Sequence, residues 1–140
     1  MKAIIDEYNK VNHFGRFLGM HFNILSPGEV EYHLEITESL LATETAAHGG
    51  VLAGFMDAIL GVAALSVVAE EGKRVATLEL KISFLAPALC NDQLSGKGSV
   101  IKKGSRIVFS EGSIYNQNGL LIAKGSGTFT AYPAEQKKEG

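Results

Sequence analysis

Residues Val51–Ala69 read VLAGFMDAILGVAALSVVA, and this stretch decides the fold because it is long and almost wholly apolar. The pattern predicts one long helix over residues 49–70, with Gly72 as its C-terminal cap. A helix that is apolar on all sides packs inside a protein core. Asp57 is the only ionisable residue of the stretch. Because burying an unpaired carboxylate is costly and Asp is a poor helix former, we expect Asp57 to have a partner or a chemical role.

The same stretch is long enough to cross a lipid bilayer. A central Asp57 and the acidic residues Glu70 and Glu71, in place of basic anchors, argue against that placement. The net charge of −2 and the absence of a basic stripe argue against nucleic-acid binding. Cys90 is the only cysteine, so no intrachain disulfide can form and a reducing, cytoplasmic compartment is expected.

Strand-like alternation occupies most of the remaining chain. The 140 residues fit one domain, residues 1–140. We predict a short amphipathic helix over residues 3–14 and a mobile polar tail over 133–140. Strands are predicted over residues 17–25, 29–37, 75–85, 94–102, 106–115 and 120–132. The fold class is therefore α+β, with one antiparallel sheet wrapped on one helix. Such long strands leave an edge exposed, which predicts self-association.

His48, Gly49 and Gly50 stand at the expected start of the long helix. A helix N-terminus offers free N–H groups and a positive dipole end, and glycine lets a carbonyl approach closely. The two glycines are therefore a candidate oxyanion site, with a simple loop-to-helix corner as the alternative. Gly49 and Asp57 are eight residues apart, about 12 Å along one helix, too far to serve one carbonyl. If Asp57 is catalytic, the active site is shared between two copies of the chain.

Small residues surround Asp57: Ala53 and Gly54 lie one turn before it and Gly61 one turn after it. This leaves room for a substrate or for a second backbone. The alternative is close structural packing, with the carboxylate hydrogen-bonded to backbone amides.

The segments AAHGGVLAGFMDAILGVAALS (46–66) and RVATLELKISFLAPA (74–88) resemble the hotdog-fold acyl-CoA thioesterases of the PaaI-like, phenylacetate-degradation type. The resemblance covers roughly residues 15–132. It implies a curved antiparallel sheet wrapped around one central helix. It also implies a homodimer, often a dimer of dimers, that hydrolyses a CoA thioester without a metal or redox cofactor, coenzyme A entering as part of the substrate.

The resemblance also implies roles for individual residues. Asp57 corresponds to a general base or nucleophile, the Gly49 N–H to a donor for the thioester oxygen, and Thr77 to a support for the attacking water. Gly50 belongs to the same substrate-binding helix start. The family usually has an Asn six residues before the His, where this chain has Ala42.

Other candidate residues leave alternatives open. Lys102, Lys103 and Arg106 flank a turn and are candidates for the CoA phosphates, or form an ordinary solvated hairpin tip. His48 either orients the helix start or takes part in catalysis, as in a hotdog dehydratase or hydratase. A non-catalytic acyl-CoA-binding protein is the third possibility, and Ala42 favours it. The other histidines have no metal-ligand spacing, so no metal is expected. The expected walls of an apolar acyl pocket are Phe14, Phe17, Leu18, Phe55 and Ile59.

Overall fold

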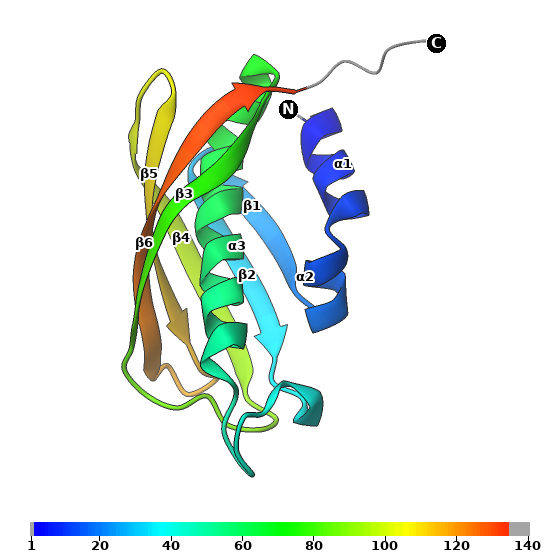
Figure 1. Cartoon of the computed structure of the whole chain (residues 1–140), viewed down its shortest axis with the longest axis vertical. Coiled ribbons are helices and arrows are strands. Elements are labelled where there is room, and N and C mark those ends of the chain that lie inside the picture. The colour runs from blue at the N-terminus through cyan, green and yellow to red at the C-terminus, as the bar shows by residue number, and fades with distance from the viewer. Residues whose placement is uncertain (1, 135–140) are drawn as a thin grey trace.

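The computed structural model describes residues 2–134, and it confirms the predicted α+β hotdog fold (Figure 1). The helices are α1 (Lys2–Val11), α2 (His13–Leu18) and α3 (Gly49–Val68), with short 3-10 turns η1 (Glu38–Leu40) and η2 (Ala69–Glu71). The strands are β1 (His21–Ser26), β2 (Glu29–Glu35), β3 (Lys73–Phe84), β4 (Gln93–Lys103), β5 (Ile107–Tyr115) and β6 (Leu121–Pro133). The sheet curves around α3, and α1 lies on the other side of that helix (Figure 1).

The six strands form one antiparallel sheet in the order β1-β2-β4-β5-β6-β3. β3 is therefore an edge strand, although it is 12 residues long. It pairs with β6 from Lys73–Pro133 to Phe84–Ala123, and its other edge meets no strand within residues 2–134. The sheet thus ends on a long row of unpaired backbone groups beside α3.

Helix α3 forms the centre of the core. Glycines in the facing strands let it approach the sheet closely: a Cβ on Gly96 would lie 2.2 Å from Ile59 Cδ1. A Cβ on Gly125 would lie 2.8 Å from Met56 Cγ. By length and hydropathy the segment Gly49–Glu71 could cross a membrane, but 61% of its most apolar window is buried inside the protein. It is the core helix of the fold, and a membrane location is not indicated.

The N-terminal region differs from the prediction. The expected single helix is two helices, because Asn12 interrupts the first and caps α2 by accepting a hydrogen bond from the Gly15 N–H at 3.1 Å. Phe17 lies in α2, so the predicted strand start at residue 17 is wrong. The chain leaves α2 at Gly19, whose φ of 80° suits glycine, and β1 begins two residues later. Of the predicted tail, Pro133 ends β6, and residues 135–140 lie outside the described residues.

Candidate active site

Asp57 and Thr77 face each other between α3 and β3. The Thr77 Oγ1 hydroxyl donates a hydrogen bond to Asp57 Oδ1 at 2.7 Å. Asp57 is half-buried and Thr77 is exposed. Hydrogen bonds to an ionised carboxylate are stronger than those between neutral groups, so this contact holds the carboxylate in one orientation. The lone acid of the apolar helix therefore has a side-chain partner, and its Oδ2 oxygen makes no protein hydrogen bond within residues 2–134.

A cleft of about 310 Å³ contains both residues. Its α3 wall is formed by Gly54, Asp57, Ala58, Gly61 and Leu65, which lie on one side of the helix. The opposite wall comes from α1 and α2, and β3 and β6 close the remaining side. A cleft of this size that combines apolar walls with a few polar groups is typical of a small-molecule site.

The polar groups on the α1 wall are bonded to other protein groups. The Asn12 Nδ2 amide donates to the Tyr8 hydroxyl at 3.2 Å, and Tyr8 is also hydrogen-bonded with the buried Tyr32. Burial raises the pKa of Tyr8; the bond with Tyr32 opposes this rise, and the negative charge of Asp57 adds to it. Burial and Tyr8 together raise the pKa of Tyr32. Both phenols therefore stay protonated at neutral pH.

One end of the cleft carries an ion pair between α1 and β3. Arg74 lines the cleft near Leu65, and its Nη2 pairs with the Glu7 carboxylate. The Arg74 Nε is buried and has no hydrogen-bond partner within residues 2–134. This ion pair joins the N-terminal helix to the edge strand.

The start of α3 has one N–H group without an acceptor among the residues that the structure describes. His48 is the N-cap residue, and its Nδ1 accepts a hydrogen bond from the Gly50 N–H at 2.8 Å. His48 thus orients the helix start, and the Gly50 N–H is already bonded. For the exposed Gly49 N–H, no acceptor is found within residues 2–134. The Gly49 N–H is therefore an exposed hydrogen-bond donor at the start of α3.

Within one chain, Gly49 and Asp57 do not meet. Helix α3 is continuous from Gly49 to Val68, so the eight-residue spacing separates them by about 12 Å along its axis. The carboxylate site and the free N–H donor are both present, but a single chain does not bring them to one carbonyl.

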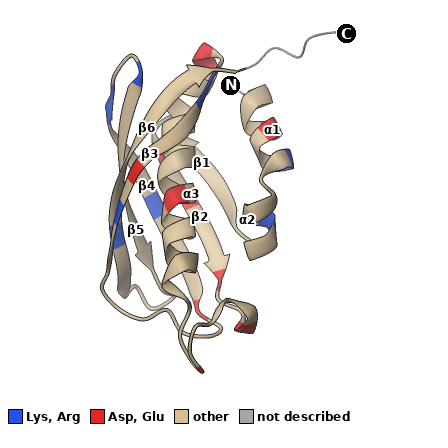
Figure 2. Cartoon of the chain, viewed as in Figure 1, with Lys and Arg blue, Asp and Glu red and all other residues tan. Residues whose placement is uncertain are grey.

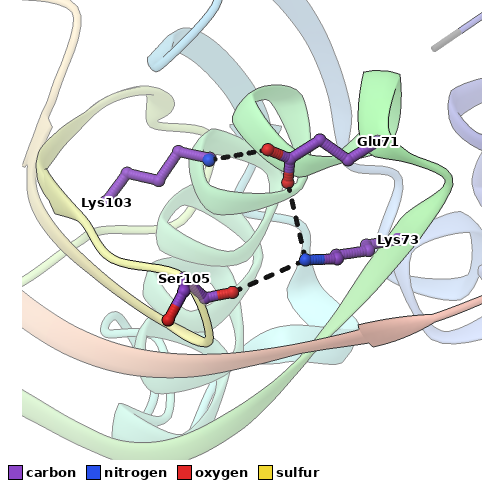
Figure 3. Close-up of polar contacts among 4 residues, drawn as sticks. All are labelled: Glu71, Lys73, Lys103 and Ser105. Carbon is purple, nitrogen blue, oxygen red and sulfur yellow. Dashed lines mark hydrogen bonds and ion pairs between the residues drawn. The ribbon is translucent and has the colours of Figure 1, made fainter.

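The three basic residues predicted for CoA phosphates lie at the β4–β5 turn, between the end of β4 at Lys103 and the start of β5 at Ile107. Figure 2 shows Lys and Arg positions in blue on this hairpin. Lys103 is not a free charge, because its Nζ lies 2.9 Å from Glu71 Oε1 and the contact lowers the pKa of Glu71 (Figure 3). The same carboxylate pairs with Lys73 at 3.8 Å. Lys102 and Arg106 are exposed. None of the three lines the cleft that holds Asp57.

The predicted acyl-pocket walls are only partly correct. Phe14 lines the cleft, but Phe17 is 82% exposed. Phe55 and Ile59 are wholly buried in the core and do not line the cleft. Sequence reasoning missed Tyr8 and Arg74 as cleft residues. The helical spacing of Tyr8 with apolar neighbours was the available signal, but it does not tell which surface that side of the helix covers.

Two further predictions concern the loop before α3 and metals. Ala42 is exposed, and its N–H donates to the Ala46 carbonyl at 2.9 Å in a tight loop. Thr43 is also used within the loop, because its hydroxyl accepts from the Ala46 N–H at 3.0 Å. Among residues 2–134, no group of three His, Cys, Asp or Glu side chains could hold a metal ion.

Comparisons with known proteins agree with this architecture. Residues 45–123 match the family model of the Thioesterase superfamily. Human acyl-coenzyme A thioesterase 13 is 26% identical over 130 residues, which cover 91% of each chain.

Two solved structures share the fold. A thioesterase family protein of Silicibacter pomeroyi has a TM-score of 0.84 and 26% identity, with 94% of this chain and 96% of that chain covered. A hypothetical thioesterase of Streptococcus pneumoniae, solved with coenzyme A, has a TM-score of 0.75 and 25% identity, with 84% and 88% covered. The family match spans more than half of the chain, and it includes the helix that carries Asp57 and the strand that carries Thr77. The chain therefore belongs to the Thioesterase superfamily.

Proposed function

We propose that this protein hydrolyses acyl-CoA thioesters to a free acid and coenzyme A. The observation that carries the proposal is the hydrogen bond from Thr77 to Asp57, which orients a carboxylate in the wall of a mostly apolar cleft. One Asp57 oxygen is fixed by Thr77, and the other is left for a water molecule or for the thioester itself.

In the proposed reaction, Asp57 takes a proton from water while the water oxygen bonds to the thioester carbonyl carbon. The oxyanion that forms accepts a hydrogen bond from Gly49 of the partner subunit. Collapse of the intermediate breaks the carbon–sulfur bond, and the departing thiolate takes the proton back from Asp57. Alternatively, Asp57 attacks the carbonyl itself, the thiolate leaves, and water hydrolyses the resulting anhydride. Thr77 positions the carboxylate in both routes.

The proposal requires a dimer, and β3 is the element that supports one. Its free edge carries exposed apolar side chains, with Leu78 57% and Phe84 53% exposed. A long, unpaired strand of this kind pairs readily with another chain. The Phe84 ring lies 3.5 Å from the Cβ position of Gly49, so it marks where the start of α3 meets β3.

The positions of Phe84 and Thr77 suggest a register for such a dimer. Two copies of β3 that pair antiparallel about an axis between Leu80 and Lys81 place Phe84 opposite the partner's Thr77. That pairing brings the helix start of one chain to the carboxylate of the other. We propose this homodimer as the active unit; the predicted dimer of dimers stays a prediction for mass measurement in solution.

A non-catalytic acyl-CoA-binding protein is the second candidate, because Ala42 stands where the resembled enzymes carry Asn. A His-based dehydratase is less well supported. His48 Nδ1 already accepts the Gly50 N–H, which ties this side chain to the helix start.

The deciding experiment is a thiol-release assay over acyl-CoAs of increasing length and aromatic content. We expect thiol release by the wild type and none by Asp57→Ala, which remains dimeric by light scattering. Asp6→Ala, an exposed acid on α1 outside the cleft, is the matched control. Binding without thiol release supports the second candidate, and near-normal turnover in a folded Asp57→Ala variant removes Asp57 from the mechanism.

The predicted phosphate contacts are tested separately. Lys102→Glu is expected to raise KM for acyl-CoA but not for the matching pantetheine thioester, which lacks the nucleotide. Equal effects on both substrates would remove Lys102 from nucleotide binding.

A further inference from the structure

The cleft continues beyond Asp57 toward the C-terminal end of α3, and its lining there is mostly apolar. Along α3 it runs from Gly54 to Leu65, so that about 12 Å of it lies beyond Asp57 on the Leu65 side. At the other end, Phe14 closes the cleft, because its ring lies 3.0 Å from the Cβ position of Gly54. A group attached to a carbonyl at Asp57 therefore has room only toward Leu65.

Along this longer part, the walls from α1, Asn12 and α3 present no unpaired polar side chain to a substrate. Tyr8 and Asn12 are hydrogen-bonded to each other, and Asn12 also caps α2. Ala58, Gly61 and Leu65 on α3 present no polar side chain to the cleft. At the far end Arg74 lines the cleft and pairs with Glu7 on α1, and a chain that passed between α1 and β3 there would have to desolvate these two charges.

Gly61 is the position of this longer part where a side chain is absent. It lies one helical turn beyond Asp57 and lines the cleft. A Cβ placed on it would meet only the Phe129 ring, at 3.4 Å from Cε1 and 3.9 Å from Cζ, which are ordinary van der Waals distances. The position therefore accepts a side chain, and anything longer than a methyl group would extend into the channel.

On the basis of the proposed thioesterase activity, we propose that the substrates are acyl-CoAs with unsubstituted, medium-length apolar acyl chains, and that Gly61 sets the length accepted. The acyl chain lies between α1 and α3, with its carbonyl at Asp57 and its end near Leu65. Each methylene buried in the channel is worth about 0.8 kcal/mol, or roughly a fourfold change in binding.

The test is a chain-length profile of saturated acyl-CoAs from butanoyl to palmitoyl. For the wild type we expect kcat/KM to rise by about fourfold per methylene, and then to stop rising when the chain reaches the Arg74–Glu7 pair. Gly61→Leu is expected to move this limit to shorter chains and to lower the decanoyl-to-butanoyl ratio of kcat/KM by about tenfold or more. Gly61→Ala is expected to change the ratio in the same direction by a smaller factor.

Two further measurements keep the test decisive. Val67→Leu changes a half-buried position of α3 that does not line the cleft, and it should leave the chain-length ratio unchanged. Dissociation constants of the same acyl-CoAs for Asp57→Asn report the channel without turnover. If the wild type releases no thiol but Gly61→Leu still shortens the length dependence of Kd, the proposed hydrolysis fails and the channel assignment stands. If folded Gly61 variants keep the wild-type length profile in both measurements, the channel assignment is overturned and the hydrolase proposal is unaffected.

Discussion

Thr77 offers the sharpest test of how Asp57 works, because the two side chains are joined by one short hydrogen bond of 2.7 Å. Thr77→Val removes the hydroxyl and keeps the shape. A hydrogen bond to a charged group contributes about 1.5–3 kcal/mol, and the exposure of Thr77 to water favours the lower end. We therefore expect kcat to fall by roughly tenfold while KM changes little. Thr77→Ser keeps the donor and should restore most of the rate.

A double-mutant cycle separates a positioning role from an independent one. Asp57→Asn alone is expected to lower kcat by about 10²–10⁴-fold, the usual contribution of a general base. If Thr77 acts only through Asp57, adding Thr77→Val to Asp57→Asn changes the rate little further, because the interaction is already lost. The assay is thiol release under saturating acyl-CoA. A further tenfold loss in the double variant, or wild-type kcat in Thr77→Val, would refute this account of the pair.

Three other outcomes are expected from the same structure. Leu78→Lys places a charge on the free edge of β3 and should convert the dimer to monomers, as measured by light scattering. Thiol release should be lost together with the dimer, and an active monomer would exclude the shared site. Gly96→Ala should lower the free energy of unfolding by about 1–3 kcal/mol, because its Cβ meets Ile59 Cδ1 at 2.2 Å, and Ile59→Val should offset part of that loss in denaturant titrations. His48→Ala removes the N-cap of α3 and should lower the free energy of unfolding by about 1 kcal/mol. Its effect on kcat should be smaller than that of Asp57→Ala. Complete inactivation of the folded variant would instead indicate that His48 takes part in catalysis.

The elements with strong local signals could be predicted from the sequence. The apolar run around Asp57 predicted the start of α3 correctly and placed its end two residues too late, because α3 ends at Val68 with Ala69 as its C-cap. The predicted cap Gly72, with a left-handed φ of 71°, closes the following 3-10 turn η2 instead. The β5–β6 turn was also predictable, because Gly119 adopts a φ of 79° between two alternating strands. The start of β1 was not, because aromatic Phe17 favours a strand locally, whereas Asn12 caps a second short helix around it.

The acid at the centre of the candidate site could be singled out from the sequence, but the walls of the cleft could not. Asp57 is conspicuous because it is the one acid in an apolar helix, and Thr77 was found only through the family resemblance. The walls depend on which side of α3 faces the sheet, and a helix that is apolar all round carries no periodic signal of that orientation. Ile59 was therefore expected in the pocket and lies instead against Gly96 in the core. The order of the strands, which leaves β3 at the edge, depends on long-range pairing that no local pattern records.

The glycine-lined groove in the sheet has a consequence for how this molecule tolerates change. Ile59 packs against Gly96 and Met56 packs against Gly125, so α3 cannot rotate about its axis or shift along it without a steric clash. Substitutions on its sheet-facing side are therefore penalised through folding, whereas the side that lines the cleft, around Gly61, has room for a larger side chain. If the proposed acyl channel is correct, chain-length selectivity can be re-engineered on the cleft side of α3 without repacking the side that faces the sheet.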